Sequence, residues 1–146
     1  MFRENFRAAA PETMKKLSEF SGLSLKSSLD ASLVHLVYLR VSQLNGCAYC
    51  VDSHTHEALA GGENPQRLYN MTVWHETSFF SDKERAALAW AEAMTSLTEK
   101  HPSAELHEAT RHAFSEKEFI DLTLAIAAIN ALNRVGVGFQ GQPDKR

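Results

Sequence analysis

Two cysteines and a histidine lie close together in the segment NGCAYCVDSH, which runs from Asn45 to His54. Asparagine and glycine are residue types that readily end a helix, so Cys47 is predicted to lie at or near the start of the next helix. In that helix Cys47, Cys50 and His54 share one face, because residues three, four and seven positions apart stack on the same side. The segment therefore predicts two successive helices joined by a tight turn.

The chemistry of this segment is that of a thiol–disulfide redox centre. Two thiols at this spacing can close a small disulfide ring, and a histidine one turn away can take or relay a proton. The free N–H groups and the partial positive charge of a helix N-terminus stabilise a thiolate and so lower the pKa of a thiol there. By this argument alone, Cys47 is the attacking cysteine.

Length and composition narrow the class of protein. The chain has 146 residues and a formal net charge of −3, and Cys47 and Cys50 are its only cysteines. We expect one domain, residues 1–146. A chain of this length buries roughly 70% of the surface that its unfolded form exposes, so it needs no disulfide in order to fold. Without a basic stripe or a run of about 20 apolar residues, neither nucleic-acid binding nor a membrane span is expected. The first residues lack the apolar core of a secretory signal, which favours a cytoplasmic location, where paired cysteines are usually catalytic or metal-binding.

Apolar residues recur at helical spacing along most of the chain, with no strand-like alternation, repeat or linker. We therefore predict one all-α domain of about six or seven helices. The predicted helices are Pro11–Phe20, Ser28 or Asp30 to about Leu44, Cys47 to Leu59 or Ala60, Pro65–Met71, a helix opened by the capping box at Ser81, Pro102 to about Phe114, and about Glu116 to Arg134.

Three further segments carry expectations of their own. The last helix is apolar nearly all round, so it must be buried in the core or between subunits. The tail from Gly136 to Arg146 is expected to be loose. The aromatic, aperiodic segment Trp74–Phe80 is expected to be a loop, packed on the core or lining a pocket. A pocket near Trp74, Phe79 and Phe80 would be hydrophobic.

Three interpretations of the cysteine segment compete. In the first, it is a catalytic dithiol. In the second, it binds a metal ion, but zinc usually takes four ligands from two separated pairs, so His54 with His35 or His75 would have to complete the set. In the third, the cysteines are two buried small apolar residues beside a satisfied histidine. The dithiol is favoured, because the only two cysteines are clustered at a helix start with His54 one turn away.

The segment LRVSQLNGCAYCVDSHT, from Leu39 to Thr55, resembles the core motif of the AhpD-like alkylhydroperoxidase family, within the carboxymuconolactone decarboxylase superfamily. Ser81–Trp90 and Ile129–Arg134 resemble later segments of that family, so the similarity extends from about Leu33 to Arg134. The resemblance implies an all-helical fold that assembles into homo-oligomers, as a trimer or hexamer.

The resemblance also implies an activity, namely the reduction of hydroperoxides or disulfides through the two cysteines. It assigns the attack on the hydroperoxide to Cys50, and it makes Cys47 the resolving cysteine that meets the external reductant. It places His54 in a proton relay and implies a dithiol reductant, in the best-known members a lipoyl-bearing protein. We expect no cofactor and no metal ion at the site.

Two positions depart from the family pattern. Where characterised peroxidases carry a relay glutamate, twelve residues before the first cysteine, this chain has His35, and it has Tyr49 where they carry a histidine. An imidazole at position 35 can relay a proton but supplies no fixed negative charge. The expected function is a thiol-dependent peroxidase or disulfide oxidoreductase, with a non-enzymatic redox sensor or binding protein as the alternative. Decarboxylase chemistry is not expected, because decarboxylases proper lack the cysteine pair.

Overall fold

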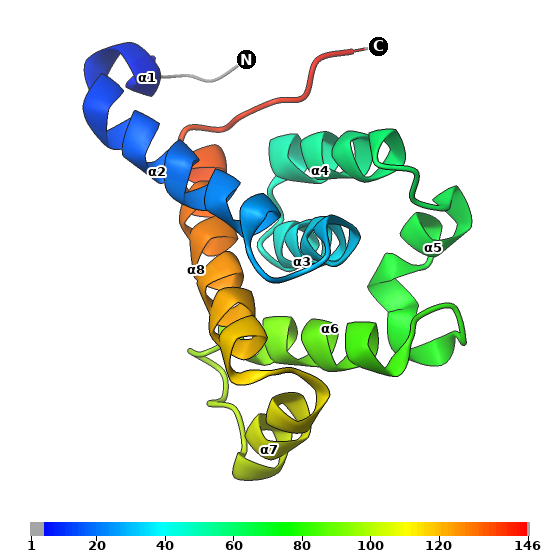
Figure 1. The fold of residues 1–146 in the computed structure, drawn as a ribbon. Helices are drawn as coiled ribbons and strands as arrows, with labels where there is room; N and C mark the ends of the chain where they lie inside the picture. Colours follow the sequence, from blue (N-terminus) through cyan, green and yellow to red (C-terminus); the bar gives the residue numbers. More distant parts are fainter. Residues whose placement is uncertain (1–4, 146) are drawn as a thin grey trace.

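The computed structural model describes residues 5–145, and this part of the chain is built from helices without any strand (Figure 1). The elements are α1 (Phe6–Ala9), α2 (Pro11–Leu23), η1 (Ser24–Lys26), α3 (Ala31–Leu44), α4 (Ala48–Ala60), α5 (Pro65–Tyr69), η2 (Met71–Glu76), α6 (Asp82–Thr95), α7 (Ala104–Ala113) and α8 (Glu116–Gly138). The predicted all-α class is confirmed.

Helix α3 lies at the centre of the molecule, with α2 and α8 on one side, α4 above it and α6 below it in Figure 1. One face of α3 packs with α6 and α8 through residues such as Val37, Trp90 and Ile126. Another face packs against the segment from α5 to α6, where Leu36 meets Met71. Because α3 is apolar on several sides, it is buried on several sides, as its sequence requires.

Local capping signals set the starts of α6 and α8 as predicted. Ser81 and Glu84 form a reciprocal capping box, in which each side chain accepts a hydrogen bond from the backbone N–H of the other. Ser115 and Glu118 do the same at the start of α8. These interactions satisfy N–H groups that a helix start otherwise leaves unpaired.

The described residues form eight α-helices and two 3-10 helices, more than the six or seven predicted, and α1 and η1 have no counterpart among the predicted helices. The structure also differs from the predictions within other segments. Helix α8 continues to Gly138, so the expectation that it ends at Arg134 and is followed by a loose segment from Gly136 is wrong at its first residues. Gly136, inside this last part of α8, packs closely against the cysteine sulfurs. The predicted loop at Trp74–Phe80 is helical in its first three residues, which belong to η2, and non-helical in residues 77–80. Its expected packing on the core is confirmed, because Trp74 and Phe80 are buried there.

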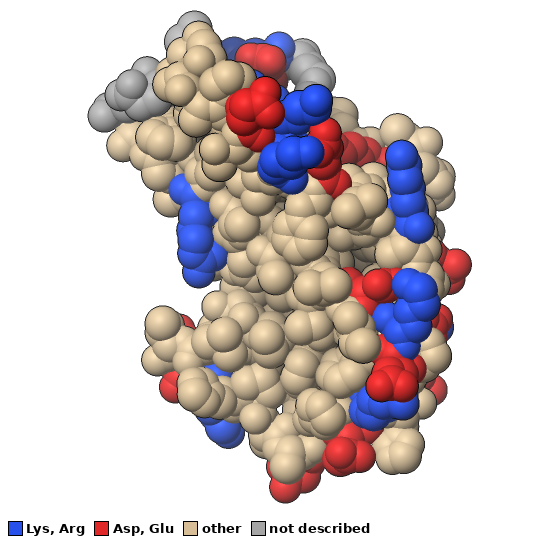
Figure 2. Space-filling view, turned by 60° about the vertical axis from the view of Figure 1, so that its left-hand side comes forward, with Lys and Arg blue, Asp and Glu red and all other residues tan. Residues whose placement is uncertain are grey.

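Helix α8 is apolar enough, by length and composition alone, to cross a membrane, and it is the one such helix among residues 5–145. It packs on α2, α3, α4 and α6, as the core helix of a globular domain does. Its outer side leaves Ile120 and Leu124 about half exposed. The face seen in Figure 2 accordingly has a broad central area with few charged side chains.

Candidate active site

The two cysteines lie at the junction between α3 and α4. Gly46 adopts a left-handed conformation, with φ of 65°, which turns the chain out of α3, and the Cys47 N–H then donates to the Ser42 carbonyl at 3.0 Å. Cys47 is the N-cap residue of α4, and its sulfur accepts a hydrogen bond from the Cys50 N–H at 3.3 Å. The two cysteines form a disulfide, so the structure shows an oxidised pair at a helix start.

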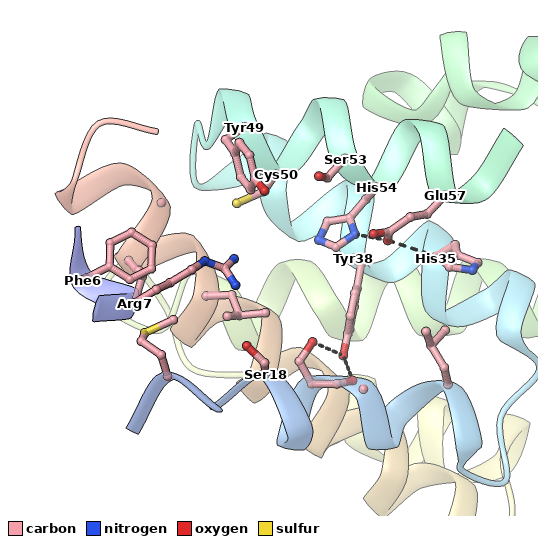
Figure 3. Close-up of a pocket in the computed structure, with 17 residues that line it drawn as sticks. Phe6, Arg7, Ser18, His35, Tyr38, Tyr49, Cys50, Ser53, His54 and Glu57 are labelled. Atoms are coloured by element: carbon pink, nitrogen blue, oxygen red, sulfur yellow. Dashed lines mark hydrogen bonds and ion pairs between the residues drawn. The ribbon is translucent and has the colours of Figure 1, made fainter. Parts of the chain in front are cut away.

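A cavity of about 500 Å³ opens beside this pair (Figure 3). Helices α1 and α2 with η1 form one wall, and α3, α4 and the end of α8 form the others. The apolar part of the lining consists mainly of Phe6, Met14, Leu25, Tyr38, Leu132 and Val135. The chemically reactive part consists of Cys50, His54, Glu57 and His35.

His54 and Glu57 form an ordered pair one helical turn apart on α4. Nδ1 of His54 lies 2.8 Å from Oε2 of Glu57. This hydrogen bond is the main cause that lowers the pKa of Glu57, so the carboxylate is ionised and can only accept. In the neutral ring the proton therefore sits on Nδ1, and Nε2 carries a lone pair. Figure 3 shows that second nitrogen turned away from Glu57 and into the cavity.

Tyr38 of α3 supports the His54 ring from the side. The two rings meet edge to face with centroids 5.1 Å apart. The Tyr38 hydroxyl donates to the Ser21 carbonyl at 2.9 Å, which ties α2 to α3 beneath the cavity. His54 is 9% exposed, so packing and the Glu57 hydrogen bond together hold its ring in place.

His35 lies on the other side of Glu57, on α3. Its Nδ1 is 3.9 Å from Oε2 of Glu57, and this buried nitrogen has no hydrogen-bond partner. Burial is the largest cause that lowers the pKa of His35; Glu57 opposes this shift and His54 adds to it. Because its pKa lies below 6.5, His35 is neutral near pH 7.

The structure thus brings Cys50, His54 and His35 to one cavity and places Cys47 directly behind Cys50. Sequence reasoning missed Glu57, which supplies the fixed negative charge that His35 lacks. A histidine followed three residues later by a glutamate on a predicted helix was the available signal. The expected pocket at Trp74, Phe79 and Phe80 is not this cavity, because none of the three lines it.

The metal interpretation receives no support from the arrangement of donors. Among residues 5–145, no group of three or more His, Cys, Asp or Glu side chains is placed to hold a metal ion. His75, which would have completed a ligand set, belongs to η2 and does not line the cavity. The site instead combines a disulfide-bonded cysteine pair with an imidazole–carboxylate pair beside it.

The chain is similar in sequence and in structure to known proteins. The sequence model of the Carboxymuconolactone decarboxylase family matches residues 11–93. An uncharacterized protein of Bacillus subtilis, YdfG, is 37% identical over 135 residues, which cover 92% of each chain. A protein of unknown function from Agrobacterium tumefaciens, described as a putative antioxidant defence protein AhpD, has a similar structure, with a TM-score of 0.96, 36% identity and full coverage of both chains. The debrominase Bmp8, in complex with 2,3,4-tribromopyrrole, has a TM-score of 0.85 over 94% of this chain and 73% of its own, but at 21% identity the likeness shows the fold alone.

Proposed function

Because the chain belongs to the carboxymuconolactone decarboxylase family and to its AhpD-like members, we propose that its cysteine pair reduces hydroperoxides at the expense of an external dithiol. The observation that carries the proposal is the wall of the cavity, where Cys50 and the His54–Glu57 pair lie together on α4. Cys47 is already within bonding distance of Cys50. A nucleophile, a base with a fixed tautomer and a resolving thiol are the parts that this reaction needs.

In the first step Nε2 of His54 takes the proton of the Cys50 thiol. The thiolate attacks the terminal oxygen of the hydroperoxide, so that an S–O bond forms and the O–O bond breaks. The leaving alkoxide receives the proton from His54 and departs as an alcohol, and Cys50 becomes a sulfenic acid. Glu57 stabilises the imidazolium that exists between the two proton transfers.

In the second step Cys47 condenses with the sulfenic acid of Cys50. The S–S bond forms and water leaves, which gives the disulfide seen in the structure. A dithiol then opens this disulfide by exchange, and two electrons return to the protein. A small dithiol or a lipoyl-bearing protein would serve as this reductant.

The lining of the cavity bears on the substrate. Most of its surface comes from aromatic and aliphatic side chains, and its volume of about 500 Å³ exceeds the needs of hydrogen peroxide. Burial of an apolar substituent contributes roughly 25 cal/mol per Å². The proposed substrates are therefore organic hydroperoxides, and we expect a lower KM for cumene hydroperoxide than for hydrogen peroxide.

The test is repeated turnover. The purified protein, mixed with cumene hydroperoxide and excess dithiothreitol or dihydrolipoamide, should consume many equivalents of peroxide, and Cys50→Ser should consume none. A non-enzymatic redox sensor would form its disulfide once and stop. A wild-type protein that consumes one equivalent and then stops would overturn the enzymatic proposal in favour of the sensor.

The assignment of the attacking cysteine has its own test. Brief peroxide treatment of the two single variants, followed by mass spectrometry, should reveal a sulfenic acid on Cys50 in Cys47→Ser. Accumulation of a sulfenic acid on Cys47 in Cys50→Ser, with none in the other variant, would make Cys47 the attacking residue, as its place at the helix start alone suggests.

A further inference from the structure

The two sulfurs of the disulfide differ in access from the cavity. Cys50 lines the cavity and is 6% exposed, whereas Cys47 does not line it and is 1% exposed. Figure 3 shows the Cys50 sulfur on the cavity side of α4. A thiol that enters the cavity therefore meets Cys50 first.

Helix α8 closes the space around Cys47. A Cβ atom at Gly136 would lie 2.6 Å from the Cys47 sulfur and 3.1 Å from the Cys50 sulfur. The backbone of α8 therefore lies close to both sulfurs at Gly136, which has no side chain. The Cys47 sulfur is the nearer of the two to the Cβ position. Thiol–disulfide exchange needs an attacking sulfur to reach the sulfur under attack, so this packing shields Cys47.

The environment of Cys47 also suits a leaving group. Its sulfur accepts the Cys50 N–H and occupies the N-cap position of α4, which has 13 residues. Negative charge at a helix N-terminus is stabilised by the unpaired N–H groups and the helix dipole, and a stabilised thiolate leaves faster. Access and leaving-group quality therefore favour the same direction of exchange.

We propose that the reducing thiol enters the same cavity as the hydroperoxide and attacks Cys50, expelling Cys47 as the thiolate. A bond forms between the thiol's sulfur and Cys50, and the bond between Cys50 and Cys47 breaks. The second thiol of a dithiol then attacks its own first sulfur, which releases Cys50 and closes the oxidised reductant as a cyclic disulfide. This differs from the resemblance-based expectation that Cys47 meets the reductant, and it rests on the proposed function only in assuming that the disulfide is reduced during turnover.

The proposal limits the class of reductant. A small aliphatic thiol, or a thiol on a slender flexible arm, can enter a cavity of about 500 Å³, whereas a thiol fixed on a flat protein surface cannot. It also means that oxidant and reductant use one site. High concentrations of either should then compete with the other during turnover.

The direct experiment uses the oxidised wild-type protein and no peroxide, so its outcome is independent of peroxidase activity. The protein is mixed briefly with 2-mercaptoethanol, quenched in acid, unfolded and alkylated with N-ethylmaleimide. Because no Lys or Arg lies between Arg40 and Arg67, both cysteines fall on one tryptic peptide, and fragmentation between them locates each group. We expect mercaptoethanol on Cys50 and maleimide on Cys47, in about tenfold or greater excess over the reverse pattern.

The opposite pattern, or a disulfide that 2-mercaptoethanol does not open, would overturn the proposal. The two single variants give a second measurement with the thiols unpaired. Cys50 in Cys47→Ser should react with 5,5′-dithiobis(2-nitrobenzoate) at least about tenfold faster than Cys47 in Cys50→Ser. Equal rates, or a faster Cys47, would contradict the shielding by α8.

Discussion

At the residue scale, the proposed role of His54 as a base requires the carboxylate of Glu57, to which its ring is hydrogen-bonded. Replacing Glu57 with Gln keeps the size of the side chain but removes its negative charge, so the imidazolium loses its partner and the ring tautomer is no longer fixed. We expect kcat/KM for an organic hydroperoxide to fall about 10- to 100-fold. The measurement is a steady-state assay over a range of pH, because loss of the charge should alter the pH profile as well as the rate.

Asp52→Asn is the matched control for this variant. It removes a carboxylate from the same helix, but Asp52 pairs with His56 at 3.6 Å and does not line the cavity. Its activity should stay close to wild type. Equal losses in Glu57→Gln and Asp52→Asn would show that α4 responds to charge in general and that Glu57 has no specific role.

His35 gives the structure a pH-dependent cost of folding. Its folded pKa is lowered below 6.5, mainly by burial, so the unfolded chain binds a proton at a higher pH than the folded chain does. As the pH falls through 6.5 the unfolded state takes up this proton first, and stability is lost until the folded His35 also becomes protonated. The free energy of unfolding of His35→Leu, measured in urea, should therefore fall less than that of wild type between about pH 7.5 and about pH 5.5. Parallel losses in the two proteins would contradict this assignment.

The sequence alone predicted residues that the structure brings together at the candidate site, but not their connections. Cys47, Cys50 and His54 could be placed together because their spacing fixes one helix face. Glu57 lies on that face too, but a glutamate near a helix end is usually solvated, and the resemblance directed attention to position 35. Glu57 lies between His54 and His35 because of the way α4 packs on α3. A local sequence pattern does not predict that packing.

At the scale of the element, Gly136 lies within helix α8, and a glycine inside a helix normally lowers the stability of that helix. Alanine in place of glycine usually stabilises a helix interior by about 0.5–1 kcal/mol. At Gly136 we expect the reverse, because the added Cβ would lie 2.6 Å from the Cys47 sulfur. Gly136→Ala should destabilise the oxidised protein by about 1–3 kcal/mol, as overpacking does, and should slow closure of the disulfide. Urea unfolding and the rate of disulfide formation are the two measurements.

Gly138→Ala is the control, since Gly138 is on the same helix and nothing lies within 4 Å of the Cβ it would gain. It should be as stable as wild type or slightly more so. If the two alanine variants behave alike, the close approach of α8 to the sulfurs has no energetic consequence.

Elements were predictable where their signals are local. The capping boxes at Ser81 and Ser115 start α6 and α8 as the sequence indicates, because each box involves residues only three apart. The end of α8 was not predictable in the same way. Gly136 is an ordinary stop signal in sequence, and its packing against a disulfide almost ninety residues earlier is a long-range contact that no local pattern shows.

At the scale of the whole molecule, the cavity is a product of long-range packing. Its wall on the N-terminal side comes from α1, α2 and η1, of which the sequence predicts only one helix, over Pro11–Phe20. In the aromatic segment Trp74 and Phe80 pack into the core cluster that contains Leu36 and Met71, which is the first of the two expected outcomes. The helical class follows from periodicity, whereas the position of a cavity requires the arrangement of helices far apart in sequence.

The outer face of α8 leads to the last prediction, which concerns assembly. Ile120 and Leu124 lie four residues apart, so they share one side of the helix, and they are 53% and 47% exposed. They belong to an element whose apolar composition predicts burial on most sides, and the face in Figure 2 carries few charges at its centre. Burying the exposed half of each side chain would contribute about 1 kcal/mol.

We therefore expect size-exclusion chromatography with light scattering, at micromolar concentration, to show a homo-oligomer, with a trimer or hexamer as the expected states. The double variant Ile120→Lys, Leu124→Lys should shift the mass toward the monomer, because two ammonium groups would have to be desolvated in the interface. Val73→Lys is the control, since Val73 is 45% exposed but belongs to η2, on the other side of the molecule from α8 in Figure 1. A monomeric wild-type protein would contradict assembly itself, whereas an oligomer that survives the double substitution would place the interface on a different face.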